Sequence, residues 1–397
     1  MKKNNLALLT IILFAFVFTS CNGQKKSRVI TEPLTLGEVI TGANQMNEYL
    51  PLLKGKNVAM AINNSSTIGG KSSLDSLLSL GINVVKLFTP EHGLRGINEY
   101  SSVDEKTGIP IVDLYRGDNR KPTKEDMSGI DIMIFEMQNV GTKFYTYKAT
   151  LRFIMEACAE NDVELIVFDR PNPNDYVDGP INEFENFVGM DPTPILHGMT
   201  MGEYALMLNG EGWLENGVKC NLKVIEVLNW KHGDPYILPI PPSPNLNTQQ
   251  SILLYASLCL FEGTVISEGR GTCYPFTIIG HPEFKDKYTF SFYPVSIPTM
   301  STNPKHLEKV CYGLDLRNYD TEIFRETGRM NLGWIIEFYN AFPDKNNFWR
   351  AETFDRLAGT SKLREQIIAG KTEQEIRESW EPGLSQYKKI REKYLIY

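Results

Sequence analysis

The sequence predicts an α/β protein with a mostly parallel sheet, followed by a smaller α/β domain. From Asn57 onward, short apolar runs alternate with stretches of helical periodicity. The apolar runs are continuous rather than alternating, which is typical of parallel strands that helices cover on both faces. We therefore expect residues 40–246 to form a doubly wound, Rossmann-like domain.

The expected elements of this domain alternate along the chain. Strands are indicated by "NVAMAINNSS" (57–66), "INVVKLFTP" (82–90), "IDIMIFEMQ" (130–138) and "ELIVFDRPNP" (164–173). Helical spacing marks "LDSLLSLG" (74–81) and "YKATLRFIMEACAEN" (147–161).

The proline-dense segment "YILPIPPSPNLN" (236–247) cannot continue a helix or a central strand, so we place the domain border at 246/247. Residues 247–397 then form the smaller domain. Its expected helical segments are "QSILLYASLCLFEG" (250–263), "NPKHLEKVCYG" (303–313), "NLGWIIEFYNAF" (331–342), "TFDRLAGTSKLREQIIAG" (353–370) and a last helix ending "YKKIREKYLIY" (387–397).

The N-terminus has the layout of a secretory signal over residues 1–20. Lys2 and Lys3 precede an apolar stretch from Leu6 to Phe18, which is short for a membrane span of about 20 residues. Cys21 then follows a small residue and is similar to the acylated cysteine of bacterial lipoproteins; the alternative is ordinary cleavage. We expect residues 21–39 to be an exported linker and the protein to be periplasmic or on the cell surface, held to the membrane by a lipid anchor.

The net charge of −7 argues against nucleic acid as a partner, because phosphate binding depends on clustered cations. The six cysteines include no C-x-x-C spacing, so no zinc knuckle or thioredoxin-type motif is present. Cys158 and Cys259 lie in apolar helical patterns and are expected to be buried free thiols.

Carboxylates follow three of the expected strands. Glu91 follows the second strand, Glu136 ends the third and Asp169 follows the fourth. Ligands of open α/β sheets bind beyond the carboxyl ends of the strands. If these strands are neighbours, the acids converge on one cleft, and we take Glu91, Glu136 and Asp169 as candidate catalytic residues.

Further polar residues surround these strand ends, and each has an ordinary structural alternative. Pro90 and Gly93 bend the chain around Glu91, which favours a placed acid over a solvated one. Asp169 could instead cap its own turn. The candidate substrate-binding residues are Asn63, His92, Arg95, Gln138, Tyr145, Tyr147, Arg170, His197, Glu268 and Arg270.

Several other readings of these residues stay open. The two tyrosines are either core packing or a stacking platform for sugar. Arg95 is either a surface cation or a partner for an anionic ligand. Glu268 and Arg270 lie in the glycine-rich loop "SEGRGT", as ligand groups or incidental charges. Thr200 and Glu203 form a capping box that starts a helix.

Known motifs for other chemistries are absent from the sequence. No G-x-G-x-x-G, G-x-S-x-G or H-E-x-x-H occurs, and His92, His197 and His281 are too scattered to indicate a metal site. We expect neither a cofactor nor a metal. A carboxylate-rich cleft with tyrosines and amides on an exported protein suits carbohydrate cleavage.

Seven segments together resemble the exo-β-N-acetylmuramidase family, the NamZ-type peptidoglycan glycosidases. They are "FTPEHGLRG", "NVGTKFYTY", "FDRPNP", "DGP", "HGMTMGE", "PPSPNL" and "EGTVISEGRGT", in this order, within residues 40–397. The resemblance implies a Rossmann-like catalytic domain, release of N-acetylmuramic acid from the non-reducing ends of peptidoglycan fragments, and Glu91 as the leading catalytic candidate.

One departure from the family pattern concerns a second acid. The family usually has "D-x-Q-D-[VI]-G", whereas this chain has Glu136 and Asn139 at the two acidic positions. We expect Glu91 to act as general acid, with Glu136 or Asp169 as the second carboxylate or with the substrate's acetamido group as nucleophile. The lactyl carboxylate needs a cation, for which Arg95, Arg170 and Arg270 are candidates.

Two alternatives come from other functional classes. A lipoprotein that binds muropeptide sugars without cleaving them would share the cleft, the tyrosines and the arginines. A nucleotide-dependent enzyme would need a phosphate-binding loop, which the sequence lacks.

Overall fold

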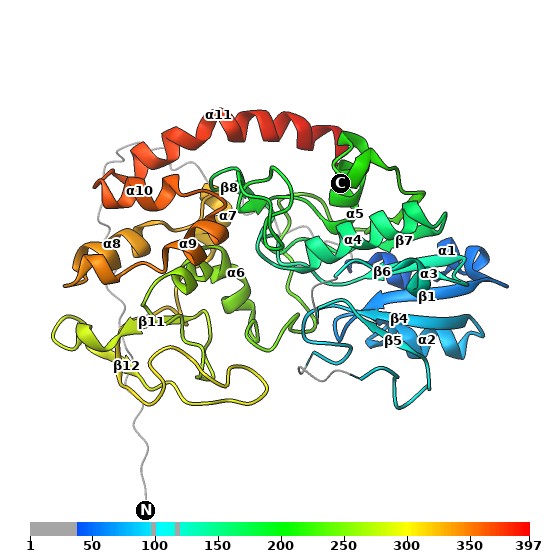
Figure 1. Cartoon of the computed structure of the whole chain (residues 1–397), viewed down its shortest axis with the longest axis horizontal. Helices are drawn as coiled ribbons and strands as arrows, with labels where there is room; N and C mark the ends of the chain where they lie inside the picture. Colours follow the sequence, from blue (N-terminus) through cyan, green and yellow to red (C-terminus); the bar gives the residue numbers. More distant parts are fainter. Residues whose placement is uncertain (1–37, 97–100, 116–119) are drawn as a thin grey trace, which may run out of the picture. The chain divides into compact units, whose positions relative to one another are not determined.

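The computed structural model describes residues 38–96, 101–115 and 120–397. Residues 57–225 contain a six-stranded sheet in the order β10-β7-β6-β1-β4-β5, in which every neighbouring pair is parallel. Figure 1 shows β7, β6, β1, β4 and β5 side by side at the right. Counted along the chain, this is the doubly wound order 3-2-1-4-5-6. The predicted fold class is therefore confirmed. The strands are β1 (Asn57–Ile62), β4 (Asn83–Thr89), β5 (Ile111–Asp113), β6 (Ile132–Glu136), β7 (Glu164–Phe168) and β10 (Leu222–Ile225).

Helices cover both faces of this sheet, which explains why its central strands are largely apolar. Alternate strand residues such as Met60 and Ile134 pack with α1 and α2, while Ala61 and Phe135 pack with α4 and α5. The helices of this part are α1 (Met46–Leu53), α2 (Ser73–Ser79), α3 (Lys124–Met127), α4 (Tyr147–Glu160) and α5 (Met201–Glu211).

Two strands of the sheet have no counterpart among the sequence-based expectations. These are β5 and β10, at the two edges of the sheet, and no residue of β5 is fully buried. Edge strands are covered less completely, so their sequences lack the continuous apolar run that marks the central strands. Two short hairpins complete this region: β2 (Thr67–Ile68) with β3 (Lys71–Ser72), and β8 (Val177–Asp178) with β9 (Leu196–His197).

Residues 236–247 contain no helix or strand, and beyond them lies a mixed α/β region. A three-stranded antiparallel sheet, in the order β11-β13-β12, packs there with helices. The elements are α6 (Gln249–Leu258), β11 (Ile278–His281), β12 (Phe290–Phe292), β13 (Cys311–Asp315), α7 (Glu322–Thr327), α8 (Gly333–Ala341), α9 (Ala351–Ala358), α10 (Lys362–Ile368) and α11 (Glu373–Arg391).

The helix expected over 303–313 is wrong. His306 and Glu308 both have positive φ, which an α-helix excludes, and Cys311 begins β13 in a buried strand position. The capping box of Thr200 and Glu203 at the start of α5 is confirmed. Among the described residues, the cysteines are free, and Cys158 and Cys259 are buried as expected.

The end of the chain returns to the large sheet. The hydroxyl of Tyr387 on α11 donates to the His197 carbonyl (2.9 Å), and Ile396 N donates to Glu203 (3.0 Å). The hydroxyl of Tyr397, the last residue, donates to Asp169 (2.7 Å). The C-terminal segment is therefore part of the structure around the carboxyl end of β7.

Gly42 lies where the chain crosses the backbone of β7 and β10, and we predict that Gly42→Ala destabilises the protein. A Cβ at this position would lie 2.2 Å from the Ile225 carbonyl oxygen, an atom that cannot move alone. We expect the free energy of unfolding in urea to fall by about 1–3 kcal/mol. Gly333→Ala, where the nearest atom is a side-chain oxygen at 3.2 Å, is the control and should be nearly neutral. Equal effects in both variants would contradict this packing.

Candidate active site

The strand order places the switch point of the sheet between β1 and β6. Asn63 follows β1, while Glu136 ends β6 and Gln138 lies two residues beyond it. Glu91 lies beyond β4 and Arg170 beyond β7, on the strands next outward. The parallel sheet therefore brings these predicted strand-end residues together at the carboxyl ends of its strands, which we call the switch-point edge.

The loop that carries Glu91 is tightly bent. His92, Gly93 and Gly96 all have positive φ, and Gly93 N donates to the Pro90 carbonyl (3.0 Å). A Cβ on Gly96 would lie 2.5 Å from the Asn64 amide oxygen, so the loop needs glycine there to pack on the end of β1. His92 is half-buried beside Glu91.

Glu91 is held by the segment that follows β6. Its side chain is half-buried, and Oε2 accepts a hydrogen bond from the Thr146 hydroxyl (2.8 Å). Thr146 directly precedes α4. A carboxylate partly exposed at a strand end and oriented by one hydroxyl is suited to proton transfer.

Tyr145 and Tyr147 are buried rather than presented as an open stacking face. Their rings meet edge to face at 4.6 Å, and the Tyr147 hydroxyl donates to the Pro242 carbonyl (3.1 Å). Burial, with Tyr147 and the negative charge of Glu91 nearby, raises the pKa of Tyr145 well above its usual value. The geometry favours the packing role for both rings.

Glu136 is fully buried and forms an ion pair with Arg170. The same carboxylate accepts from Thr67 N (3.0 Å) and from the Ser73 hydroxyl. Arg170 also donates to the Thr67 carbonyl (3.3 Å). These contacts connect the β2–β3 hairpin and the start of α2 to the ends of β6 and β7. Glu136 and Arg170 therefore both stabilise the fold.

Asp169 is also fully buried, and its carboxylate accepts four hydrogen bonds. The donors are Arg170 N (2.9 Å), Gly202 N (2.8 Å), the Thr200 hydroxyl (2.6 Å) and the Tyr397 hydroxyl (2.7 Å). Burial raises the pKa of Asp169 to about 6 although these donors act against it. The pattern favours the structural alternative for Asp169, at the start of α5, over a place in an open cleft.

A cavity of about 310 Å³ lies between the end of β1 and the Glu91 loop. Asn63 and Arg95 both line it, and Arg95 also lines a neighbouring cavity of about 560 Å³. Asp104 pairs with Arg95 (2.8 Å), but the Arg95 side chain is still 55% exposed. Arg95 is therefore the predicted cation that an anionic ligand in these cavities can reach.

Asp113 is a strand-end acid that the sequence reasoning missed. It ends β5, pairs in register with Thr89 of β4 and lines the 560 Å³ cavity. The run "IPIVDLYRG" has only a short apolar part before the acid, so it lacks the longer continuous apolar pattern of the central strands. Asp113 adds one carboxylate on the Glu91 side of the sheet.

The remaining predicted residues have partners of their own. His197 is fully buried; its Nδ1 accepts from Met199 N (3.2 Å), and burial lowers its pKa well below the usual value. Glu268 pairs with Lys305 (2.9 Å), and Arg270 pairs with Glu262 (2.6 Å), all within the C-terminal region. Burial opposes the charge of Glu268, but the two cations outweigh it and lower its pKa.

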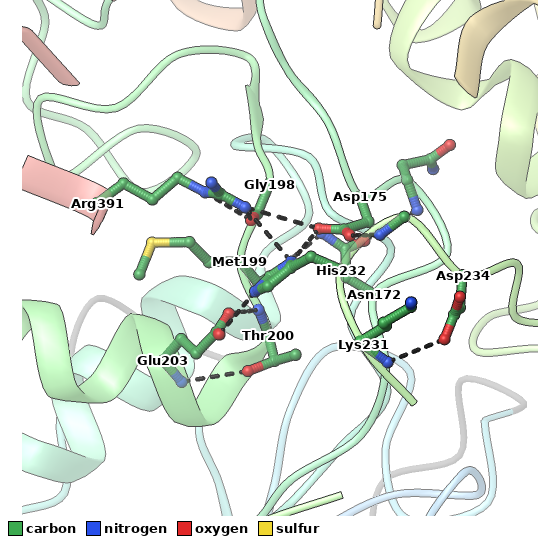
Figure 2. Close-up of polar contacts among 12 residues, drawn as sticks. Asn172, Asp175, Gly198, Met199, Thr200, Glu203, Lys231, His232, Asp234 and Arg391 are labelled. Atoms are coloured by element: carbon green, nitrogen blue, oxygen red, sulfur yellow. Dashed lines mark hydrogen bonds and ion pairs between the residues drawn. The ribbon is translucent and has the colours of Figure 1, made fainter. Parts of the chain in front are cut away.

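A second histidine site, centred on His232, was not anticipated from the sequence. Its ring nitrogens contact Asp175 (2.8 Å) and Glu203 (2.7 Å), and Arg391 of α11 reaches the Gly198 carbonyl beside it (Figure 2). Burial lowers the pKa of His232, but the hydrogen bonds and charges of the two acids outweigh burial and raise it to about 9. His232 is therefore an imidazolium at neutral pH that joins three segments.

No group of three metal-ligating side chains occurs in the described part of the chain. None of the helices in those same residues is long and apolar enough to span a membrane.

The fold and site define an α/β protein with polar residues at the carboxyl ends of the strands of a doubly wound sheet and cavities beside the end of β1 and the Glu91 loop. Family models described as "Exo-beta-N-acetylmuramidase NamZ, N-terminal" and "C-terminal" match residues 58–250 and 253–397. The chain therefore belongs to the NamZ exo-β-N-acetylmuramidase family, as the motifs predicted.

Individual relatives agree with this assignment. The chain is 36% identical to the peptidoglycan beta-N-acetylmuramidase NamZ of Bacillus subtilis (strain 168), with both chains covered over their full length. Crystal structures of two DUF1343 family proteins from Bacteroides fragilis NCTC 9343 are similar, at 44% and 27% identity with TM-scores of 0.84 and 0.78. The two matches cover 91% and 90% of this chain and 99% of each of the two crystallised chains.

We predict that stability depends on pH through His232. Its pKa in the folded protein, about 9, lies above the value of about 6.5 of an unfolded histidine, so the folded state binds the proton more tightly. The stabilisation is complete below pH 6.5 and is lost as pH rises through 9. The free energy of unfolding is measured in urea at pH 6.5 and at pH 9. Its decrease between the two pH values should be smaller for His232→Gln than for the unaltered protein. An identical loss in both proteins would contradict the assignment.

Proposed function

We propose that this protein is an exo-acting glycoside hydrolase that releases N-acetylmuramic acid from the non-reducing ends of peptidoglycan fragments, in cell-wall turnover. The observation that carries the proposal is the match of both family models along nearly the whole described chain, together with Glu91 at the switch-point edge. The curated relative matched over its full length is named for cleavage of the same kind of bond.

Glu91 is proposed as the general acid. It is half-buried, so solvent does not fully screen it, and Thr146 fixes one carboxylate oxygen at 2.8 Å. In glycoside hydrolysis the acid protonates the leaving glycosidic oxygen while positive charge develops on the sugar ring. The guanidinium of Arg95, exposed in the adjoining cavities, is proposed to receive the lactyl carboxylate.

The second catalytic group is proposed to be neither Glu136 nor Asp169. Glu136 and Asp169 are fully buried, and their carboxylates already accept three and four hydrogen bonds. We therefore propose, as the second catalytic group, either Asp113 or the substrate's own acetamido group. Asp113 ends β5, the strand that pairs with β4 just before Glu91. Separations of about 5–5.5 Å or 6.5–9.5 Å between the two carboxyl groups, with substrate bound, would indicate retention or inversion.

We also propose that the protein is an exported lipoprotein, periplasmic or on the cell surface, acylated at Cys21. Support comes from the sequence alone: Lys2 and Lys3, the apolar stretch up to Phe18 and the cysteine that follows. All of these lie outside the described residues.

Glu91→Gln should lower kcat by about 10²–10⁴-fold, because the amide cannot donate a proton as an acid does. The assay is release of N-acetylmuramic acid from a short peptidoglycan disaccharide, whose sugar leaving group needs protonation, with the dissociation constant of N-acetylmuramic acid measured by calorimetry. Binding should change little. Glu125→Gln, an exposed acid on α3, is the control.

Two outcomes would overturn parts of this proposal. Unchanged hydrolysis by Glu91→Gln would sink the assignment of the acid. Binding of N-acetylmuramic acid without any turnover by the unaltered protein would favour the non-catalytic binding alternative, in which the same cleft captures muropeptide sugars.

Cys21→Ser should move the protein from the membrane fraction to the soluble fraction of the cells that express it, because the acyl chains can no longer be attached. Detergent phase partition and intact mass report the change. Cys273→Ser, at an exposed thiol, is the control and should stay membrane-bound. Solubility of the unaltered protein would contradict the anchor.

A further inference from the structure

The hydroxyl of Thr146 donates to Glu91 and does not cap the helix that follows it. Four other threonines precede helices in an extended conformation, and each hydroxyl accepts from the N–H three residues further on: Thr123, Thr200, Thr248 and Thr372. Thr146 has helical backbone angles (φ −63°, ψ −17°) and makes no such cap at the start of α4. Its hydroxyl lies instead 2.8 Å from Glu91 Oε2.

The backbone and neighbours of Thr146 hold this hydroxyl in one place. Its carbonyl accepts from Thr150 N (3.0 Å) and from the Thr150 hydroxyl (3.3 Å). Tyr145 and Tyr147, on either side, are buried with their rings in contact. A threonine side chain is also branched at Cβ, which restricts its rotation. The bent Glu91 loop therefore faces a donor of fixed position.

This hydrogen bond distinguishes the two carboxyl oxygens of Glu91. An ionised carboxylate can only accept, so the single proton of the Thr146 hydroxyl points to Oε2. When Glu91 is protonated on Oε1, that bond is kept. Protonation on Oε2 would require the hydroxyl to turn round and accept instead. The geometry therefore favours Oε1 as the oxygen that carries the acidic proton.

We infer that Thr146 is a positioning residue, which directs the acidic proton of Glu91 to Oε1 and stabilises the carboxylate left when that proton is transferred. The inference rests on the proposed function. The proton passes from Oε1 to the glycosidic oxygen as the bond between this oxygen and the anomeric carbon breaks, and the bonding electrons stay with the oxygen. Thr146 keeps its own proton throughout.

The contact with Thr146 becomes stronger during this step. A hydrogen bond to a neutral acid turns into one to a carboxylate, and charge-assisted bonds are roughly twice as strong as neutral ones. Glu91 also lies within hydrogen-bond distance of the residue before α4, where the positive end of the helix dipole favours an anion. Both effects grow as charge develops, so they accelerate proton transfer rather than tighten substrate binding.

The test compares kcat/KM for two substrates that differ in their need for an acid. The sugar leaving group of a short peptidoglycan disaccharide must be protonated, whereas the phenolate of a dinitrophenyl β-N-acetylmuraminide leaves as a stable anion. We expect Thr146→Val, which keeps the shape and removes the hydroxyl, to lower the value for the disaccharide about tenfold and that for the aryl glycoside less than about twofold. Thr146→Ser, which restores the donor, should recover cleavage of the disaccharide.

Thr150→Val is the matched control. It removes a hydroxyl one turn further along α4 that donates to a main-chain carbonyl, and the ratio of the two kcat/KM values should not change. Thermal unfolding of each variant checks the fold. Because Thr146 caps nothing, its valine variant should unfold close to the temperature of the unaltered protein.

The outcomes separate this inference from the proposed function. Equal losses on both substrates, or no loss on either, in Thr146→Val would overturn the positioning role. If Glu91→Gln is selectively slow on the disaccharide and Thr146→Val is not, the general acid stands and this inference alone fails. If Glu91→Gln cleaves the disaccharide normally, the general acid and its positioning residue both fail.

Discussion

The ion pair of Glu136 and Arg170 is the contact on which the arrangement of the switch-point edge depends. Both side chains are almost completely buried, where an unpaired charge costs several kcal/mol. Glu136 therefore gathers donors from Thr67 and Ser73 as well as Arg170, and these come from three separate segments. The loops after β1, β6 and β7 are consequently fixed relative to one another before any substrate is considered.

A second set of polar contacts connects the C-terminal segment to the same edge. Asp169 accepts from Tyr397, the last residue, and His232 joins Asp175 to Glu203 at the start of α5. Arg391 of α11 reaches the same region through the Gly198 carbonyl. The smaller region therefore contributes to the rigidity of the large sheet's edge and is not merely an appended domain.

The polar groups at this edge differ in how many of their hydrogen-bonding positions other protein groups already occupy. Glu136 and Asp169 are fully buried and accept three and four hydrogen bonds from protein donors, so both stabilise the fold. Glu91 accepts a hydrogen bond from Thr146 and is only half-buried, so it keeps capacity for a ligand. Catalysis and recognition require such unused capacity, since a saturated group gains nothing from substrate.

The sequence by itself determined the α/β class, the four central strands and the bent loop around Glu91, because continuous apolar runs and Pro–Gly punctuation are local signals. It also showed the family through seven ordered motifs. Only the tertiary structure decided that Arg170 belongs to Glu136, that Asp169 is bonded to Tyr397, 228 positions away, and that His232 lies between two acids. Burial and hydrogen-bond saturation depend on neighbours that are distant in the chain, so a strand-end acid that supports the fold and one that is free to react look alike until the chain is folded.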